Sequence, residues 1–203
     1  MEQKIQRMFD RAEIIRLVQS WGFLRDDHRW DELRALYAPD ALQTTSWSVG
    51  TATEFIDRCI AGAKKPAARR SMHSIGASII EINGERALTE TRRTILTRAV
   101  VHGIEVDVTN HGRSFDWLVR LDGEWKIKLR SGIYERDRMD PVDPAKTITL
   151  DAVELAKYPE GYRHLAYLQA GAGERISPHL PTPNSAALAK LYADGRAWLD
   201  GKA

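Results

Sequence analysis

The residue best suited to move a proton in this sequence is a histidine in an apolar strand. His73 alternates with Ile75, Ala77 and Ile79, which predicts that its side chain points into an apolar interior. A histidine in such a place is most often a hydrogen-bonded core residue. A carboxylate beside it would instead raise its basicity and fix its tautomer, as proton abstraction near neutral pH requires. His73 is therefore a candidate general base.

A second polar cluster lies at residues 109–113 and includes Asn110, His111 and Arg113. If the alternation of Phe115 and Trp117 extends backwards, His111 and Arg113 share their face of the strand, which we expect to line the interior. A buried arginine beside histidines would stabilise an anionic oxygen of a substrate or transition state. The alternative is a strand end that lies in solvent.

Aromatic residues could complete a pocket that accepts a ring, although aromatic side chains at core spacing are usually core. The candidates for contact with a substrate are Trp21, Tyr37, Trp47, Phe55, Phe115 and Tyr134, together with Asn110, and Arg93 is a weaker candidate. The sequence has no phosphate-binding glycine loop and no convincing set of metal ligands, so neither a cofactor nor a metal is expected.

The elements that must position these residues are helices followed by an antiparallel meander. Apolar residues recur at helical spacing over 9–25, 30–37 and 51–63, and strands are expected at 41–49, 72–82, 86–101 and 104–121. Asn83-Gly84 and Asp122-Gly123 are strong hairpin signals. One apolar face is predicted for the last hairpin, formed by Phe115, Trp117, Val119, Leu121, Trp125, Ile127, Leu129, Ser131 and Ile133. The order predicts an α+β fold in which a curved sheet forms a pocket.

A turn-rich linker at 139–144 suggests two parts. Residues 1–138 are expected to form the main domain. Residues 139–203 are expected to form a helical extension that packs on this domain or on a partner subunit, with helices at 150–156, 161–170 and 185–199. The loop at 62–70 is small and basic, and is the best candidate for a mobile segment at the pocket mouth.

The charges of the chain are balanced, with 30 basic and 28 acidic residues. Positive residues are not clustered into a stripe, which argues against nucleic acid as a partner. No stretch resembles a signal peptide or approaches the length of a membrane span, so a cytoplasmic protein is expected.

Several short motifs together resemble a known family. They are Asp10-Arg-Ala-Glu-Ile-Ile-Arg-Leu, Trp21, Asp26, Trp30-Asp31, Leu33, Leu36-Tyr37, Pro39-Asp40-Ala41, Met72-His73-Ser74-Ile75-Gly76, Gly84-Glu-Arg-Ala87 and Asp122-Gly-Glu-Trp125. Their order over residues 2–137 resembles the SnoaL-like branch of the nuclear transport factor 2-like superfamily. The resemblance implies a cone-shaped α+β barrel whose curved antiparallel sheet wraps a long N-terminal helix. It also implies a homodimer or higher homo-oligomer formed through the outer sheet face.

The resemblance also implies a catalytic pair. In dehydratase and dehydrochlorinase relatives an aspartate near the end of the first helix orients a histidine that acts as general base. Asp26 and His73 match these two residues, and Asp27 is the alternative acid. His111 is the candidate match to a second pocket histidine. The sequence departs from the common pattern at Trp21, where a tyrosine is usual.

These features predict a cofactor-independent lyase of the dehydratase or retro-aldol, deformylating type. Its substrate would be a small aromatic or cyclic molecule, with a lignin-derived diaryl compound as one candidate. A ketosteroid-isomerase-like isomerase or a polyketide cyclase is one alternative. The other is a non-catalytic module for small-molecule binding or dimerisation, because this fold hosts many functions.

Overall fold

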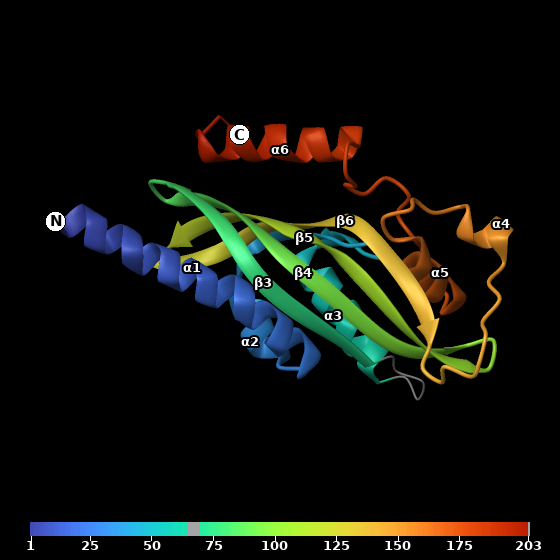
Figure 1. The fold of residues 1–203 in the computed structure, drawn as a ribbon. Coiled ribbons are helices and arrows are strands. Elements are labelled where there is room, and N and C mark those ends of the chain that lie inside the picture. The colour runs from blue at the N-terminus through green and yellow to red at the C-terminus, as the bar shows by residue number, and fades with distance from the viewer. Residues whose placement is uncertain (65–69, 203) are drawn as a thin grey trace.

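The computed structural model describes residues 1–64 and 70–202. Helix α1 (Glu2–Asp26) and helix α2 (Trp30–Ala35) come first, followed by β1 (Tyr37–Thr44), β2 (Val49–Thr51) and α3 (Ala52–Ala63). Four long strands follow: β3 (Arg70–Asn83), β4 (Arg86–Val101), β5 (Ile104–Leu121) and β6 (Glu124–Pro141). The remaining elements are α4 (Ala152–Leu155), α5 (Arg163–Gly171) and α6 (Ala186–Leu199) (Figure 1). Most of the pocket-mouth loop predicted at 62–70 lies outside the described residues.

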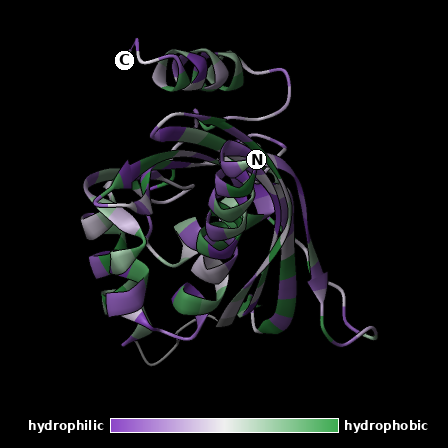
Figure 2. Cartoon of the chain, turned by 90° about the vertical axis from the view of Figure 1, so that its left-hand side faces the viewer, coloured by the Kyte–Doolittle hydropathy of each residue, from purple (hydrophilic) through white to green (hydrophobic). Residues whose placement is uncertain are grey.

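The strands form one curved, open sheet in the order β2-β1-β6-β5-β4-β3. Neighbouring strands are antiparallel except β1 and β6, which are parallel. The sheet wraps around α1, whereas α6 lies on the opposite side of it (Figure 2). This arrangement confirms the predicted α+β fold with a curved sheet around a long N-terminal helix. Among the described helices, none is long and apolar enough to cross a membrane.

Helix α1 begins earlier than its periodicity predicted, at Glu2 instead of residue 9. Asp10, which resembles an N-cap in the sequence, is instead a buried residue of the helix that forms an ion pair with Arg120 of β5. The apolar stripe of α1 packs against the concave face of the sheet, which is where the largest core cluster lies. The stripe consists of Ile14, Leu17, Val18, Trp21 and Leu24.

The convex face of the sheet is also apolar where α6 covers it. Phe115 packs edge-on against Tyr192, and Trp117 stacks on Trp198 with 5.5 Å between ring centroids. The alternation of β5 is as predicted, but the face that carries Phe115 and Trp117 is the outer one. The prediction that this face lines the pocket is therefore wrong. Ser114, Asp116 and Leu118 are the residues of this stretch that point to the concave side.

Two of the β-bulges in the sheet change the face on which predicted residues lie. The first bulge lies in β6. Leu118 of β5 pairs with Ile127 of β6, and Trp117 pairs with Leu129, so Lys128 between them has no partner. Trp125 and Ile127 therefore lie in the concave core, whereas Ile133 packs with α6. The single apolar face predicted for this hairpin is wrong for this reason, since one extra residue reverses the alternation.

The second bulge lies in β3, where Gly76 and Ala77 interrupt the pairing with β4. His73 and Ile75 lie before this bulge and face α1. Beyond it Ile80 and Ile82 enter the core, and Ile79 is 71% exposed. His73 and Ile79 therefore do not share a face, contrary to the alternation of the sequence.

The C-terminal extension packs on the sheet of its own chain, on both faces. Helix α5 covers the concave end of β5 and β6, where Leu165 and Ala166 pack with Val106 and Val108. The Asp137 carboxylate of β6 accepts hydrogen bonds from the α5 residues His164 and Leu165. Helix α6 covers the convex face, so the two helices lie on opposite sides of one sheet (Figure 1).

Candidate active site

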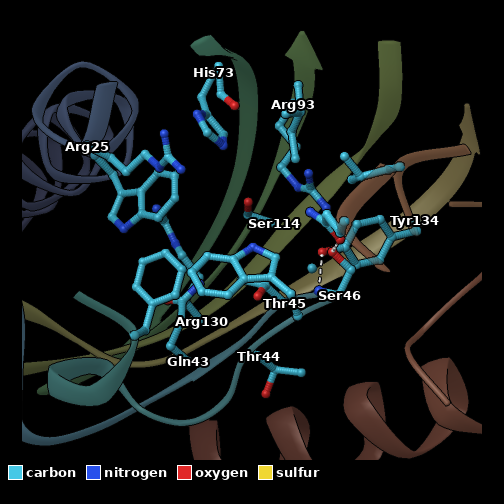
Figure 3. A pocket seen from close by; sticks show the side chains of 18 of the residues that line it. Arg25, Gln43, Thr44, Thr45, Ser46, His73, Arg93, Ser114, Arg130 and Tyr134 are labelled. Atoms are coloured by element: carbon cyan, nitrogen blue, oxygen red, sulfur yellow. Dashed lines mark hydrogen bonds between the residues drawn. The ribbon is translucent and has the colours of Figure 1, made fainter. Parts of the chain in front are cut away.

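A small cavity lies on the concave side of the sheet, between α1, α3 and α5. Its volume is about 70 Å³, measured as the space open to the centres of water molecules. That exceeds the roughly 10–15 Å³ that one water needs and is far below the roughly 300–1,000 Å³ of pockets for drug-sized ligands. Its wall includes Trp21, Arg25, Gln43, Ser46, Trp47, Phe55, His73, Arg93, Ser114, Arg130, Tyr134, Leu165 and Gln169 (Figure 3).

The Asp26 carboxylate at the end of α1 holds His73 by two hydrogen bonds. The His73 ring Nδ1 is 2.7 Å from Asp26 Oδ1, and the His73 backbone N–H donates to Asp26 Oδ2 at 2.5 Å. Both side chains are largely buried, with 9% of His73 and 15% of Asp26 exposed. Asp27 is exposed, so of the two candidate acids Asp26 is the one that meets the histidine.

A glycine on α1 makes this contact possible. A Cβ atom on Gly22 would lie 2.8 Å from the His73 carbonyl oxygen and 3.0 Å from the Ile75 side chain. Only a residue without a side chain lets the helix approach β3 so closely. Asp26 lies four residues later, one helical turn further along the same face. Gly22 therefore sets the depth at which Asp26 reaches the strand.

The hydrogen bond defines the protonation state of the histidine. Asp26 accepts at Nδ1, so the neutral ring carries its proton there and has a free lone pair on Nε2. Burial, together with the charges of Arg25 and Arg93, lowers the pKa of His73 below its usual value, although the Asp26 carboxylate raises it. Burial alone would raise the pKa of Asp26, but the hydrogen bonds and charge of His73 together hold it below its usual value. The pair is thus a carboxylate and a neutral imidazole, which can accept a proton.

A chain of buried hydrogen bonds holds the aromatic residue Trp21 beside His73. The Trp21 ring meets the His73 ring edge-on at 5.4 Å, and Trp21 Nε1–H donates to the Tyr37 hydroxyl at 2.6 Å. The Tyr37 hydroxyl donates to Gln43 Oε1 at 2.7 Å, and burial raises the pKa of this tyrosine. Tyr37 was predicted to contact a substrate, but it lies behind the wall and supports Trp21.

The floor of the cavity contains a buried ion pair. Arg130 of β6 donates to both carboxylate oxygens of Asp116, at 2.6 and 2.9 Å, and its guanidinium lies 4.7 Å from the Trp21 ring centroid. Arg130 was not predicted as a site residue, because the bulge at Lys128 turns it inward. Its inward position could be found only from the pairing register of the hairpin, which the sequence does not show.

The far end of the cavity is closed by the C-terminal extension. The Tyr134 hydroxyl accepts a hydrogen bond from the Ser46 backbone N–H at 2.9 Å, as the dashed line in Figure 3 shows. The Ser46 hydroxyl donates to Gln169 Oε1 of α5 at 2.6 Å. Ser46 and Gln169 are more than 120 residues apart in sequence, and no local pattern links them.

Five predicted site residues lie outside the cavity: Tyr37, which supports Trp21 from behind, and Asn110, His111, Arg113 and Phe115. The Arg113 guanidinium pairs with Glu90 and with Glu135 and donates to the Tyr192 hydroxyl of α6, all on the convex side. His111 shares that face and lies 3.2 Å from the Thr94 hydroxyl. The prediction that these two residues face the pocket is wrong, because the face they share with Phe115 is the outer one. Asn110 is also outside the wall, and donates to the Gly161 carbonyl at 3.0 Å.

The structure therefore brings together only part of the predicted set. The predicted residues that meet at the cavity are Asp26, His73, Trp21, Trp47, Phe55 and Tyr134. Arg25, Gln43, Ser46, Arg130 and Gln169 join them without having been predicted, and the weaker candidate Arg93 becomes a wall residue.

A curved antiparallel sheet around a long N-terminal helix is the architecture of the nuclear transport factor 2-like superfamily. Residues 6–131 match the family model described as a SnoaL-like domain, and the chain belongs to this family.

Relatives and solved structures agree with this assignment. Over 95% of its length the chain is 34% identical to Pea pathogenicity protein 2 of Fusarium vanettenii, of which it covers 87%. A structure from Novosphingobium aromaticivorans named for scytalone dehydratase aligns over 70% of this chain and 99% of its own, with a TM-score of 0.56 at 17% identity. A hexachlorocyclohexane dehydrochlorinase from Novosphingobium barchaimii aligns over 72% and 99%, with a TM-score of 0.55 at 16% identity. The two structures establish a shared fold.

Proposed function

We propose that the protein is a cofactor-independent lyase in which His73 is the general base. The observation that carries this proposal is the Asp26–His73 pair at the wall of the cavity, with His73 Nδ1 2.7 Å from the carboxylate. The Asp26 hydrogen bond and the edge of the Trp21 ring hold the imidazole in one orientation, and burial lowers its pKa, so the ring is neutral at neutral pH and can accept a proton. The dehydratase and dehydrochlorinase named among the structures of the same fold support an elimination reaction.

The reaction that suits this pair is a β-elimination. The His73 Nε2 lone pair takes a proton from a carbon next to an electron-withdrawing group. The electrons of that C–H bond form the new double bond as the bond to the leaving group breaks. In a dehydration the imidazolium returns its proton to the departing oxygen, which leaves as water. The Asp26 carboxylate stabilises the imidazolium between these two steps.

The substrate we propose is a small molecule with a single ring. Trp21, Trp47 and Phe55 supply flat apolar surface on one side of the cavity. A cavity of about 70 Å³ suits one ring better than the two rings of a lignin-derived diaryl compound. A retro-aldol cleavage would use the same base on a hydroxyl group, and an isomerisation would return the proton to a different carbon. The reaction product distinguishes these outcomes.

The test is a screen of aromatic and cyclic alcohols and enones, followed by absorbance, with product analysis of each hit. Replacing His73 by Ala should lower kcat/KM by a factor of about 10²–10⁴, the usual contribution of a general base. His111→Ala is the matched control, because this histidine lies on the outer face and should leave turnover unchanged. Turnover by His73→Ala at the wild-type rate would refute the assignment.

A further inference from the structure

Arg93 is a buried cation whose guanidinium reaches the cavity beside His73. The residue is only 6% exposed, and it lies on β4 next to the strand that carries His73 (Figure 3). Ile75 pairs with Arg93 and His73 pairs with Ile95, so Arg93 and His73 are diagonal neighbours on the concave face. Their backbones lie roughly 7–8 Å apart, and both side chains line the same cavity.

The contacts of Arg93 leave one of its nitrogens free. Nε donates to the Arg113 carbonyl at 3.2 Å, and the guanidinium lies 4.6 Å from the Tyr134 ring centroid. Nη2 is buried and has no hydrogen-bond partner among the described residues. A Cβ atom on Gly132 would lie 2.9 Å from Nη2 and 2.8 Å from the Tyr134 ring, so the absence of a side chain there lets the guanidinium lie against β6 at the cavity wall.

The charges around the cavity do not balance. The lining residues that the structure describes include Arg25, Arg93 and Arg130 and no carboxylate. Arg130 is neutralised by Asp116, and Arg25 lies 3.4 Å from Asp26. No carboxylate in the described part of the chain forms an ion pair with Arg93, and burial lowers its pKa. Buried charges in proteins are normally paired. Arg93 therefore lacks the negatively charged partner that a buried cation normally has.

We infer that the cavity binds a small cyclic or aromatic carboxylic acid, whose carboxylate accepts a hydrogen bond from Arg93 Nη2 while its ring lies against Trp21, Trp47 and Phe55. This inference rests on the proposed function, because the same molecule would present its C–H group to His73. A carboxylate suits the site better than a phenol, since a carboxyl group ionises near pH 4 and a phenol near pH 10. Only the acid brings a full negative charge to the site at neutral pH.

The experiment compares acids with their neutral amides as ligands of the purified protein. The probes are benzoate, phenylacetate and cyclohexanecarboxylate, each beside its amide, which has nearly the same shape and no charge. Binding is followed by tryptophan fluorescence, because Trp21 and Trp47 line the cavity, and is checked by calorimetry. We expect at least one acid to bind about tenfold or more tightly than its amide, as a hydrogen bond to a charged group predicts.

Variants locate the preference. Arg93→Gln should abolish the difference between acid and amide. Arg98→Gln is the matched control, because Arg98 lies on the same strand in an exposed ion pair with Asp107 and should keep the difference. His73→Ala should also keep it, because this variant removes the base and leaves the cation. If Arg93→Gln fails to fold, the comparison of acid and amide in the wild-type protein decides by itself.

Three results would overturn the inference: amides that bind as tightly as acids, a preference for acids that survives in Arg93→Gln, or no binding of any acid up to about 10 mM. These results are distinct from failure of the proposed function. Full turnover by His73→Ala would refute the assignment of His73 as general base, but it would not affect the preference for acids. If His73→Ala loses turnover but the wild-type protein shows no preference for acids, only the inference of a carboxylate ligand is refuted.

Discussion

The substitution Asp26→Asn tests the reasoning about the His73 tautomer most directly. The Asp26 carboxylate has two acceptor oxygens, and each receives one hydrogen bond from His73, from ring Nδ1 and from the backbone N–H. An asparagine side chain has one acceptor oxygen and one donor NH₂ group. The backbone N–H is always a donor and must meet the oxygen. The NH₂ group therefore faces Nδ1, which can accept only if the ring proton moves to Nε2.

The expected loss follows from this exchange. With its proton on Nε2 the ring presents no lone pair to a substrate. In the active tautomer the Nδ1–H of the ring would face the NH₂ group of the asparagine. Two donors that face each other cannot form a hydrogen bond, which costs about 1–3 kcal/mol. The variant also loses the carboxylate charge that stabilises the buried imidazolium, worth about 2 kcal/mol or more. Together these amount to about 3–5 kcal/mol, or a loss of two to four orders of magnitude in kcat/KM.

Two measurements check this expectation. Steady-state kinetics on a substrate from the screen gives the loss in kcat/KM, and nitrogen NMR of the His73 ring reports the tautomer without any substrate. Asp27→Asn is the matched control, because it makes the same chemical change one residue away on an exposed side chain. The reasoning fails if Asp26→Asn keeps kcat/KM within about threefold of wild type, or if the ring proton stays on Nδ1.

Further predictions concern pH, packing, the buried ion pair and assembly. Burial lowers the pKa of His73, so kcat/KM should rise with pH through a midpoint below about 6.5 and level off above it; a midpoint above 6.5 in the pH–rate profile contradicts this. The unfolded chain binds the extra proton first as the pH falls below about 6.5, so wild type should lose stability over this window, and His73→Ala should lose less, by urea titration. Gly22→Ala should cost about 1–3 kcal/mol in urea unfolding and reduce turnover, because its Cβ would press on β3, whereas Gly62→Ala, with no atom within 4 Å, should be neutral or stabilising. Asp116→Asn should cost about 3–5 kcal/mol in the same assay because it leaves a buried arginine unpaired, and Asp107→Asn, in an exposed pair, less than about 1 kcal/mol; equal costs would contradict the burial argument. The homodimer or higher homo-oligomer stays a prediction that light scattering after gel filtration checks, and a monomer at high concentration would exclude it.

Asp26 and His73 could be predicted because the evidence for them is short-range. Asp26 lies at the end of an amphipathic helix and His73 in a strand, and both elements follow from apolar periodicity within a few turns or residues. The spacing of Asp26 to the Trp30-Asp31 motif and the match of His73 then depend on the order of motifs along the chain. None of this requires knowledge of which elements touch.

The faces of the strands could not be found in the same way. Alternation correctly grouped His111, Arg113, Phe115 and Trp117, because successive side chains of a strand always point to opposite sides. Both faces of this sheet are covered, however, one by α1 and α5 and the other by α6. An apolar face therefore did not identify the inner one.

By itself the sequence determines the family, the α+β order of elements, the two hairpin turns, and the pairing of His73 with an acid at Asp26 or Asp27, between which the structure chooses Asp26. Only the tertiary structure decides which residues surround that pair. A bulge at Lys128 turns Arg130 inward, α5 brings Gln169 to the wall from a distant part of the chain, and the lack of an acidic partner marks Arg93. The physical reason is that periodicity is a property of neighbouring residues along the backbone. The charge and shape of a cavity are sums over residues that meet only when the chain has folded.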